Sequence, residues 1–306
     1  MYKYWKIREI IAKMAALVGT NRHKRRQIRD KIRFAGLIQS TGHYDIARKK
    51  YPTPIAISLC FNGDGYKLAA VSIRSLVMAA SDRCDYRIYC IVDSTVHSEH
   101  RRILGRMVAD TQSTITFIDA NHDFDTAHRR RWPVAVYYRM MLPKLLPDID
   151  QIIYADIDTI FCRDLIDLAC LDMGDNLVAG VADYANGYIN SGVLVMNLKQ
   201  MRDENIYDTW VRAAHKKNCK NPDQDLLNYT TRGRKIFLPL RYNFQSMLGT
   251  RLFKVHTDRE FFDLRHHLVV MHYSNWMKPW HPHNRRPIYS NLWWDAARQT
   301  DLRFDL

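Results

Sequence analysis

Short apolar runs alternate with amphipathic stretches along the chain from Pro52 onward. The runs have the length of strands, and those rich in Ile and Val throughout are typical of strands buried on both faces. Amphipathic stretches at 67–80 and 97–109 predict helices between the early runs. This alternation favours βαβ units and an α/β fold with a mainly parallel sheet. The expected strands are 54–61, 86–93, 114–119, 151–156 and 177–183.

The later part of the chain is expected to be more helical. Helices are predicted near 199–217 and 223–230, and a last apolar run, HLVVMHY, follows at 267–273. We therefore predict three parts, which are a basic helical extension (1–52), a main domain (53–281) and a helical tail packed on that domain (282–306).

The first 50 residues hold most of the positive charge. They contain 14 Lys and Arg against three Asp and Glu, an excess of 11, whereas residues 51–306 contain 32 against 29, an excess of three. Apolar side chains recur at helical spacing in residues 2–18, with basic side chains elsewhere around the helix. Three interpretations stay open: a helix in the interface of an anionic membrane, a helix packed on the main domain, and an arm that binds nucleic acid.

The six cysteines form no C-x-x-C pair, and most lie in apolar runs, which favours a reducing compartment. No uncharged apolar run of about 18 residues is present, so no membrane span is expected. Charged residues interrupt the N-terminal apolar positions, so no signal peptide is expected either. We expect the protein in the cytosol or on the cytosolic face of a membrane.

Acidic residues follow several of the predicted strands. Each alone also fits a turn or a helix N-cap. Ligands of open α/β sheets gather outside the carboxyl ends of the strands, so together these acids make that edge a candidate place for a cation. They are Asp64, Asp93, Asp119, Asp156 and Asp183.

Asp156 and Asp158 end one of the most apolar runs, QIIYADID. In an extended strand, side chains two apart share a face, so we expect both carboxylates to point one way and Ile157 to point into the core. Two converging carboxylates repel each other unless a cation lies between them. Oxygen ligands suit Mg²⁺ or Mn²⁺, and an added imidazole favours Mn²⁺.

Five stretches of the chain together resemble glycosyltransferase family eight. They are NGDGY (62–66), YADIDTIF (154–161), YINSGVLVMNL (188–198), DQDLLN (223–228) and HYSNWMKPW (272–280), in the order and at the spacing of that family. The family consists of retaining sugar-nucleotide enzymes that include bacterial lipopolysaccharide galactosyl- and glucosyltransferases and, more distantly, glycogenin. The resemblance spans about residues 54–281. It implies a single GT-A-type nucleotide-sugar-binding domain with a Rossmann-like mixed sheet.

The resemblance implies a role for each matching residue. Asp156, Asp158 and His272 match the metal ligands, and Lys278 matches the positive charge beside the donor diphosphate. Asp64 and Tyr66 match the loop that contacts uracil and ribose. Arg139 matches a helical arginine near the donor sugar, and the positions around the transferred hexose are Asn190, Asp223 and Gln224, with Asp225 beside them.

Some of these residues have equally simple explanations. Asp225 also fits the first turn of a helix, where an acid is favourable. Arg139 alone reads as a surface ion-pair residue. The family usually has glycine three residues after the metal histidine, where this chain has Asn275, so the contact to the diphosphate is expected to differ there.

The function implied by the resemblance is the transfer of a hexose, galactose or glucose favoured, from a UDP-sugar to a glycan hydroxyl. The expected acceptor is lipopolysaccharide core, capsule or another lipid-linked saccharide, with Mn²⁺ or Mg²⁺ assisting departure of UDP. Residues 1–50 are expected to hold the enzyme on the cytoplasmic face of the inner membrane. Front-side attack and double displacement both stay open, and Gln224 and Asp225 are the candidate catalytic residues for the second, with Asp223 beside them.

Two other functions are weighed against this one. A metal-dependent sugar-1-phosphate nucleotidyltransferase would carry a glycine-rich loop with Arg or Lys after the first strand, and FNGDGYKLAA fits that pattern poorly. A basic nucleic-acid-binding protein with an inactive enzyme fold would spread basic and aromatic residues over the main domain. The basic excess lies before residue 51 instead, so no nucleic acid is expected as a partner.

Overall fold

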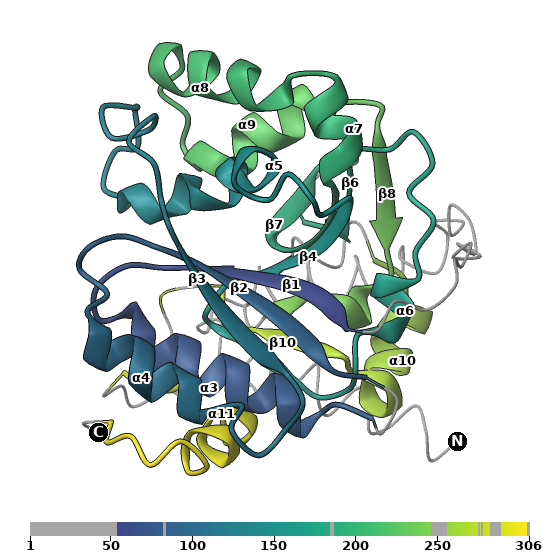
Figure 1. Cartoon of the computed structure of the whole chain (residues 1–306). Helices are drawn as coiled ribbons and strands as arrows, with labels where there is room; N and C mark the ends of the chain where they lie inside the picture. The colour runs from purple at the N-terminus through teal and green to yellow at the C-terminus, as the bar shows by residue number, and fades with distance from the viewer. Residues whose placement is uncertain are drawn as a thin grey trace, which may run out of the picture.

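The computed structural model describes residues 54–81, 84–183, 187–245, 256–274, 276, 278–281 and 289–304. Its chain forms one sheet of seven strands between two helical layers, with a smaller sheet of three strands beside it (Figure 1). The predicted helix at 2–18 and the basic extension to residue 52 lie outside the described residues.

The large sheet has the strand order β3-β2-β1-β4-β7-β6-β8. Only β7 runs against its neighbours, because it pairs antiparallel with β4 and β6 while the other pairs are parallel. The predicted mainly parallel, mixed sheet is therefore confirmed. The strands are β1 (Ile55–Cys60), β2 (Tyr86–Val92), β3 (Thr114–Asp119), β4 (Gln151–Ala155), β6 (Val178–Ala182), β7 (Ile189–Asn197) and β8 (Lys235–Leu238).

Helices cover both faces of this sheet and form two apolar cores with it. The lower layer in Figure 1 contains α3 (Gly65–Met78), α4 (Ser98–Arg106) and α11 (Ser290–Ala297), and the first core lies between this layer and the sheet. The upper layer closes the second core. It contains η1 (Val134–Met141), α5 (Leu142–Leu145), α7 (Leu198–Asp203), α8 (Ile206–Lys216) and α9 (Pro222–Thr230). The two short helices α6 (Ile166–Ala169) and η2 (Leu240–Tyr242) and the helix α10 (Asp258–His267) complete the described helices.

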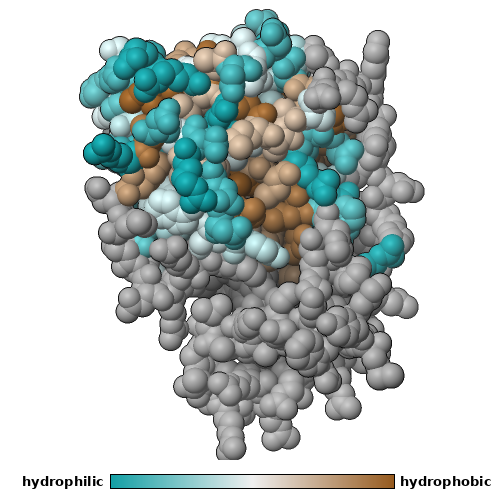
Figure 2. All heavy atoms as spheres, turned by 90° about the horizontal axis from the view of Figure 1, so that it is seen from below, coloured by the Kyte–Doolittle hydropathy of each residue, from teal (hydrophilic) through white to brown (hydrophobic). Residues whose placement is uncertain are grey.

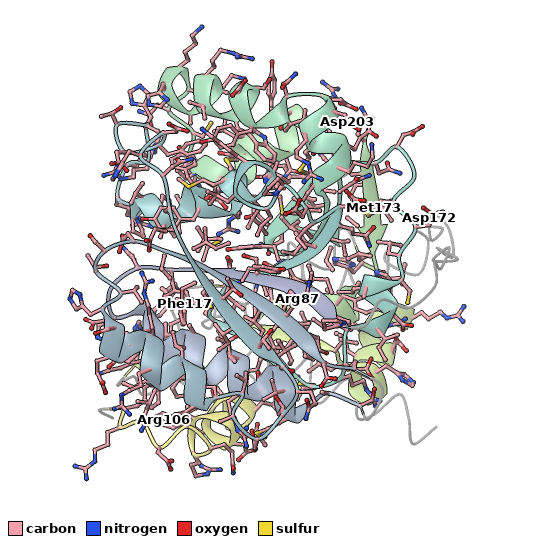
Figure 3. The ribbon with its side chains drawn as sticks, viewed as in Figure 1. Arg87, Arg106, Phe117, Asp172, Met173 and Asp203 are labelled. Atoms are coloured by element: carbon pink, nitrogen blue, oxygen red, sulfur yellow. The ribbon has the colours of Figure 1, made fainter. Side chains whose placement is uncertain are left out.

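The edge strand β3 differs from the buried strands β1 and β4 because a neighbour covers only one side of it. Each of its residues is exposed or half-buried, and none is buried. Phe117, labelled in Figure 3, is covered by the guanidinium of Arg101, which lies 5.5 Å from the ring centroid. Arg101 also pairs with Asp119 at 2.7 Å, so one side chain of α4 contacts two residues of the edge strand.

The predicted geometry of the two aspartates is wrong in one respect. The sequence predicts that the pleat of an extended strand aligns them, but β4 ends at Ala155 and β5 (Thr159–Phe161) begins a second sheet. Asp156 and Asp158 lie in the turn between the two strands. The Thr159 hydroxyl donates to the Asp156 carbonyl at 2.7 Å and stabilises this turn. The turn, and not a pleat, therefore aims the two carboxylates.

The small sheet brings the end of the chain to this turn. Its order is β5-β10-β9, with β10 (Val270–His272) antiparallel to β5 and parallel to β9 (Phe244–Gln245). His272 is paired with Thr159, one residue after Asp158. The apolar run at 267–273 therefore ends in a strand that places a histidine beside the two aspartates.

One predicted helix is divided in two. The stretch 199–217 forms α7 and α8, and Asn205 separates them with a φ of 52°. Asn adopts this left-handed conformation more readily than most residues, and a right-handed helix cannot continue through it. The other predicted strands and helices agree with the structure to within a few residues.

The C-terminal helix α11 packs against α3 in the lower layer. Leu68 of α3 and Leu292 and Trp294 of α11 are half-buried and extend the first core towards the surface. Seen from below, the molecule has an apolar area between hydrophilic side chains (Figure 2). A separate C-terminal tail at 282–306 stays a prediction, since residues 282–288 lie outside the described part. Within the described chain, no helix is both long and apolar enough to cross a membrane.

Candidate active site

Asp156, Asp158 and His272 form a cluster at the junction of the two sheets. Nε2 of His272 lies 3.5 Å from Oδ2 of Asp156 and 3.2 Å from Oδ1 of Asp158. One ligand atom from each residue lies within 4.8 Å of the others. Two carboxylates and an imidazole form a donor set that suits a divalent cation of the Mn²⁺ type.

The backbone around the cluster leaves room for these side chains only because position 192 is glycine. A Cβ built on Gly192 would lie 2.1 Å from Cε1 of His272 and 2.9 Å from Oδ2 of Asp156. A Cβ atom essentially never lies this close to a heavy atom to which it is not bonded. The backbone of β7 at Gly192 therefore packs directly against His272 and Asp156. The cluster fits a metal site.

Lys278 extends the cluster on the side of Asp158. Its ammonium group lies 2.5 Å from Oδ2 of Asp158 and also donates to the carbonyl of Tyr273. Burial acts to raise the pKa of Asp158, but the charges of Lys278 and His272 outweigh it and hold this pKa well below its usual range. Asp158 is therefore ionised and Lys278 is held beside the candidate metal position.

Arg139 is a buried residue of the site and not the surface residue that its sequence alone suggests. Its guanidinium binds Asp156 at 2.8 Å, Asp223 at 3.3 Å and the carbonyl of Ser191 at 2.7 Å. It also lies 4.4 Å from the ring centroid of Tyr154. Burial acts to lower the pKa of Arg139, but the neighbouring carboxylates dominate and raise it. The permanent charge of Arg139 thus joins the metal cluster to α9.

The residues expected around the hexose are brought together by hydrogen bonds between β7 and α9. Oε1 of Gln224 accepts from Asn190 Nδ2 at 3.1 Å and from the Ser191 backbone at 3.0 Å. The Ser191 hydroxyl donates to Asp223 at 2.9 Å. Nε2 of Gln224 donates to Asp183 at 3.1 Å, so the amide of Gln224 is fixed in orientation.

Both carboxylate oxygens of Asp225 already have partners. The Tyr188 hydroxyl donates to Oδ1 at 2.5 Å, and the backbone N–H of Asn221 donates to Oδ2 at 2.9 Å. An acid in the first turn that binds a preceding N–H stabilises the start of its helix. This geometry agrees with the simpler explanation of Asp225, which is an acid that stabilises the first turn of its helix.

The loop after β1 meets the turn that holds the two aspartates. A Cβ at Gly65 would lie 3.1 Å from Cδ1 of Ile157 and 3.1 Å from Cβ of Phe61. Ile157 is half-buried and packs on the first core, as expected. The loop that the sequence associates with the nucleotide therefore lies next to the candidate metal site.

Within this loop, Gly63 has a φ of 42° and its N–H donates to the hydroxyl of Thr95 at 2.7 Å. Asp64 is exposed and makes no side-chain hydrogen bond as the N-cap of α3. Tyr66 stacks on His100 of α4, with ring centroids 4.0 Å apart and planes 9° apart. His100 therefore covers one face of the Tyr66 ring. Contact of Tyr66 with uracil stays a prediction.

Three other acids expected at this edge serve different contacts. Asp93 accepts from the hydroxyls of Tyr138 and Thr95, and Asp119 pairs with Arg101. Asp183 accepts from Gln224. Among the five acids after the predicted strands, Asp156 is therefore the one that joins the cluster. Asn275, where glycine is usual in the family, lies outside the described residues.

Asn243 is a buried residue of the site that the sequence did not indicate. Its Oδ1 lies 2.9 Å from Nδ1 of His272, and its Nδ2 donates to Oδ1 of Asn190 at 2.8 Å. The backbone N–H of Gly192 also donates to Oδ1 of Asn190, which identifies that atom as the oxygen. Asn243 must then present its amide to Asn190 and its oxygen to His272. This arrangement places a proton on Nδ1 and directs Nε2 towards the two carboxylates.

Replacing Asn243 by alanine is therefore expected to weaken Mn²⁺ binding by about 10–100-fold, the usual effect of losing the partner that orients a ligating histidine. Electron paramagnetic resonance titration of free Mn²⁺ without donor measures this affinity. Asn197→Ala is the matched control, because Asn197 caps α7 by accepting from Gln200 at 3.1 Å, away from the cluster. Equal Mn²⁺ affinity in Asn243→Ala and the parent would contradict the role of Asn243.

Comparison with known proteins gives a consistent result. The family model for glycosyl transferase family 8 matches residues 56–284. The chain is 22% identical over 276 residues to a lipopolysaccharide 1,3-galactosyltransferase of Salmonella typhimurium, covering 82% of this chain and 80% of that protein. It is 28% identical over 170 residues to a lipopolysaccharide 1,2-glucosyltransferase of Escherichia coli, covering 49% of this chain and 50% of that protein.

The fold is also similar to that of a solved structure. The crystal structure of the galactosyltransferase LgtC with donor and acceptor sugar analogues has a TM-score of 0.70 to this chain. The match has 24% sequence identity and covers 81% of this chain and 97% of that one. The residues matched by the family model include the whole Asp156–Asp158–His272 cluster and the β7–α9 network. The chain belongs to glycosyl transferase family 8 and has the GT-A fold.

Proposed function

We propose that the protein transfers a hexose, galactose or glucose, from a UDP-sugar to a hydroxyl of a glycan, with retention of anomeric configuration. The observation that carries this proposal is the meeting of two groups of residues in one place. Asp156, Asp158, His272 and Lys278 form a cluster suited to a divalent cation and a diphosphate, and the β7–α9 network beside it presents amides and carboxylates suited to sugar hydroxyls. Arg139 joins the two groups.

Asp156, Asp158 and His272 would hold Mn²⁺, or Mg²⁺ in its place. When bound, the metal would neutralise charge that develops on the departing UDP. Lys278 adds a positive charge on the same side, where it is held by Asp158 and the Tyr273 carbonyl before any donor arrives. Such preorganised charge needs little rearrangement as the sugar–phosphate bond breaks.

The contacts of α9 favour front-side attack over double displacement. Asp225 uses both of its oxygens for Tyr188 and Asn221, and Gln224 is a neutral amide with little nucleophilicity. In front-side attack the acceptor oxygen bonds to the anomeric carbon on the face that UDP leaves. The acceptor proton passes to a phosphate oxygen of the departing UDP, so no protein nucleophile is required.

The acceptor we propose is lipopolysaccharide core, capsule or another lipid-linked saccharide. Two of the relatives are named as lipopolysaccharide glycosyltransferases, and residues 1–50 carry an excess of 11 positive charges that suits an anionic membrane surface. We place the enzyme on the cytoplasmic face of the inner membrane, where UDP-sugars are available. Nucleic acid is not part of this proposal.

Incubation with a panel of UDP-sugars, with Mn²⁺, Mg²⁺ or EDTA, tests the proposed activity. Release of UDP is expected with UDP-galactose or UDP-glucose in Mn²⁺ and is expected to stop in EDTA. The panel includes the N-acetylated donors, and a parallel reaction with UTP and hexose 1-phosphate scores pyrophosphate. Pyrophosphate release without UDP release would indicate a nucleotidyltransferase and contradict the proposal.

A further inference from the structure

Two loops of the upper layer carry basic side chains that the proposed transfer does not use. One loop precedes η1 and the other joins α8 to α9. Nε of Arg130 donates to Asn218 at 3.2 Å and Nε1 of Trp132 donates to the Lys220 carbonyl at 3.4 Å, so the loops lie against each other. We call the basic residues of the two loops, together with the last residue of α8, the basic rim: Arg129, Arg130, Arg131, Lys216, Lys217 and Lys220.

The positive charge of the basic rim is not neutralised within the described chain. No carboxylate of the described residues forms an ion pair with any of its six members. The nearest acids in sequence have other partners, since Asp123 pairs with Lys144 at 3.0 Å and Asp125 with His122 at 2.8 Å. Arg130, Arg131, Lys216 and Lys220 are exposed. The basic rim is therefore available to an anionic ligand.

The basic rim adjoins the residues expected around the transferred sugar. Lys220 precedes Gln224 by four residues, and α9 begins between them at Pro222. Four residues of chain span at most about 14 Å, so the backbone of Lys220 lies within that distance of Gln224. On the other loop, Trp132 precedes Arg139 by seven residues of which most form η1. A ligand on the basic rim would therefore lie close to the residues expected around the reacting hexose.

The electrostatic surroundings of Cys219 agree with this placement. Burial raises the pKa of its thiol, and the negative charge of Asp225 raises it further, while Lys217 and Arg130 lower it. The thiol of Cys219 therefore interacts electrostatically both with the first turn of α9 and with the basic rim. The rim and the catalytic side of α9 are neighbours in space as well as in sequence.

The basic rim lies on the opposite layer from the nucleotide loop. Tyr66 packs on the first core with α3, whereas Ala127 and Cys219 of the two rim loops pack on the second core. Figure 1 shows α3 and α4 below the sheet and α8 and α9 above it. If the base of the donor binds at the lower layer, the upper layer is free to bind the acceptor.

We propose that the basic rim binds phosphate groups carried by the acceptor saccharide. This inference rests on the proposed transfer to a glycan. Arginine and lysine pair strongly with phosphate oxygens. Trp132 and Tyr229, which are 40% and 66% exposed, flank the rim and offer flat apolar faces to sugar rings. The ammonium of Lys217 lies 3.2 Å from the Tyr229 ring centroid and joins that aromatic face to the charged group.

The probe is core oligosaccharide from deacylated Escherichia coli lipopolysaccharide, used before and after chemical dephosphorylation. Calorimetry measures its binding to the full-length protein, and transfer from the active UDP-sugar gives KM and kcat. Arg131→Gln/Lys220→Gln and Arg131→Gln/Lys216→Gln remove charge only, because these side chains make no hydrogen bond within the described chain. We expect each pair to weaken binding of the phosphorylated oligosaccharide by about tenfold, through KM and not kcat.

The matched control is Arg87→Gln/Arg106→Gln, which removes the same charge from two exposed positions on β2 and α4 (Figure 3). Its binding of both oligosaccharides should equal that of the parent. The dephosphorylated oligosaccharide should bind the parent and the rim variants equally weakly. Vesicles containing anionic phospholipid should bind the parent and the rim variants equally, because we assign membrane contact to residues 1–50.

Two results would overturn the proposal: unchanged binding of the phosphorylated oligosaccharide in both rim variants, or a loss confined to vesicles, which would make the rim a membrane contact. Calorimetry separates this outcome from failure of the proposed function. If no UDP-sugar is turned over but the rim variants lose oligosaccharide binding, the transfer is wrong and the phosphate site stands.

Discussion

Asp158→Asn is expected to lower UDP release from the active donor by about a thousandfold. The change is isosteric but removes the charge that Asp158 presents to the metal position and to Lys278 at 2.5 Å. Metal stabilisation of a departing phosphate contributes several kcal/mol, and about 4 kcal/mol corresponds to three powers of ten in rate. Mn²⁺ affinity, measured by paramagnetic resonance, should fall with the rate.

A second aspartate provides the control for Asp158→Asn. Asp110 also forms an ion pair, with Arg74 at 2.7 Å, but it is exposed and lies in the loop between α4 and β3. Asp110→Asn should keep parental turnover and Mn²⁺ affinity, since exposed ion pairs contribute about 1 kcal/mol or less to stability. Parental activity in Asp158→Asn, or in the companion variant Asp156→Asn, would remove the basis of the metal assignment.

The fold could be predicted from sequence because each element has a local signal. The apolar runs at β1, β2, β4 and β6 and the amphipathic stretches at α3 and α4 have strand and helix periodicity that does not depend on distant residues. The division of 199–217 was missed because it depends on the conformation of one residue, Asn205. Asp156 was predicted as a site residue for the same reason, because the end of an apolar run can be recognised from the local sequence.

The contacts between distant segments could not be predicted in this way. Nothing near Asn243 in the sequence indicates that it orients His272, because that contact depends on the pairing of β9 with β10. Arg139 resembles a surface residue in sequence, and its burial follows from the packing of η1 on the sheet. The turn at Asp156 likewise occurs because the chain passes from β4 in the first sheet to β5 in the second. Such features require the tertiary structure.

Arg139→Met is expected to destabilise the fold by about 3–5 kcal/mol. Arg139 is 6% exposed, and its removal leaves Asp156, Asp223 and the Ser191 carbonyl without their cationic partner in a buried place. Breaking a buried ion pair from one side has this cost because the remaining charges stay buried. For a domain of this size, the melting temperature should fall by about 10 °C. Thermal and urea unfolding in EDTA measure both quantities.

Arg139→Lys separates the charge of Arg139 from its geometry. Lysine keeps one positive charge but cannot bridge two carboxylates and a carbonyl with a planar fork, so its loss of stability should lie between the parent and Arg139→Met. Mn²⁺ should restore part of the stability of Arg139→Met, because a cation at Asp156 replaces some of the missing charge. A loss below about 1 kcal/mol for Arg139→Met would mean that water compensates the two carboxylates and that Arg139 does not join the metal cluster to α9.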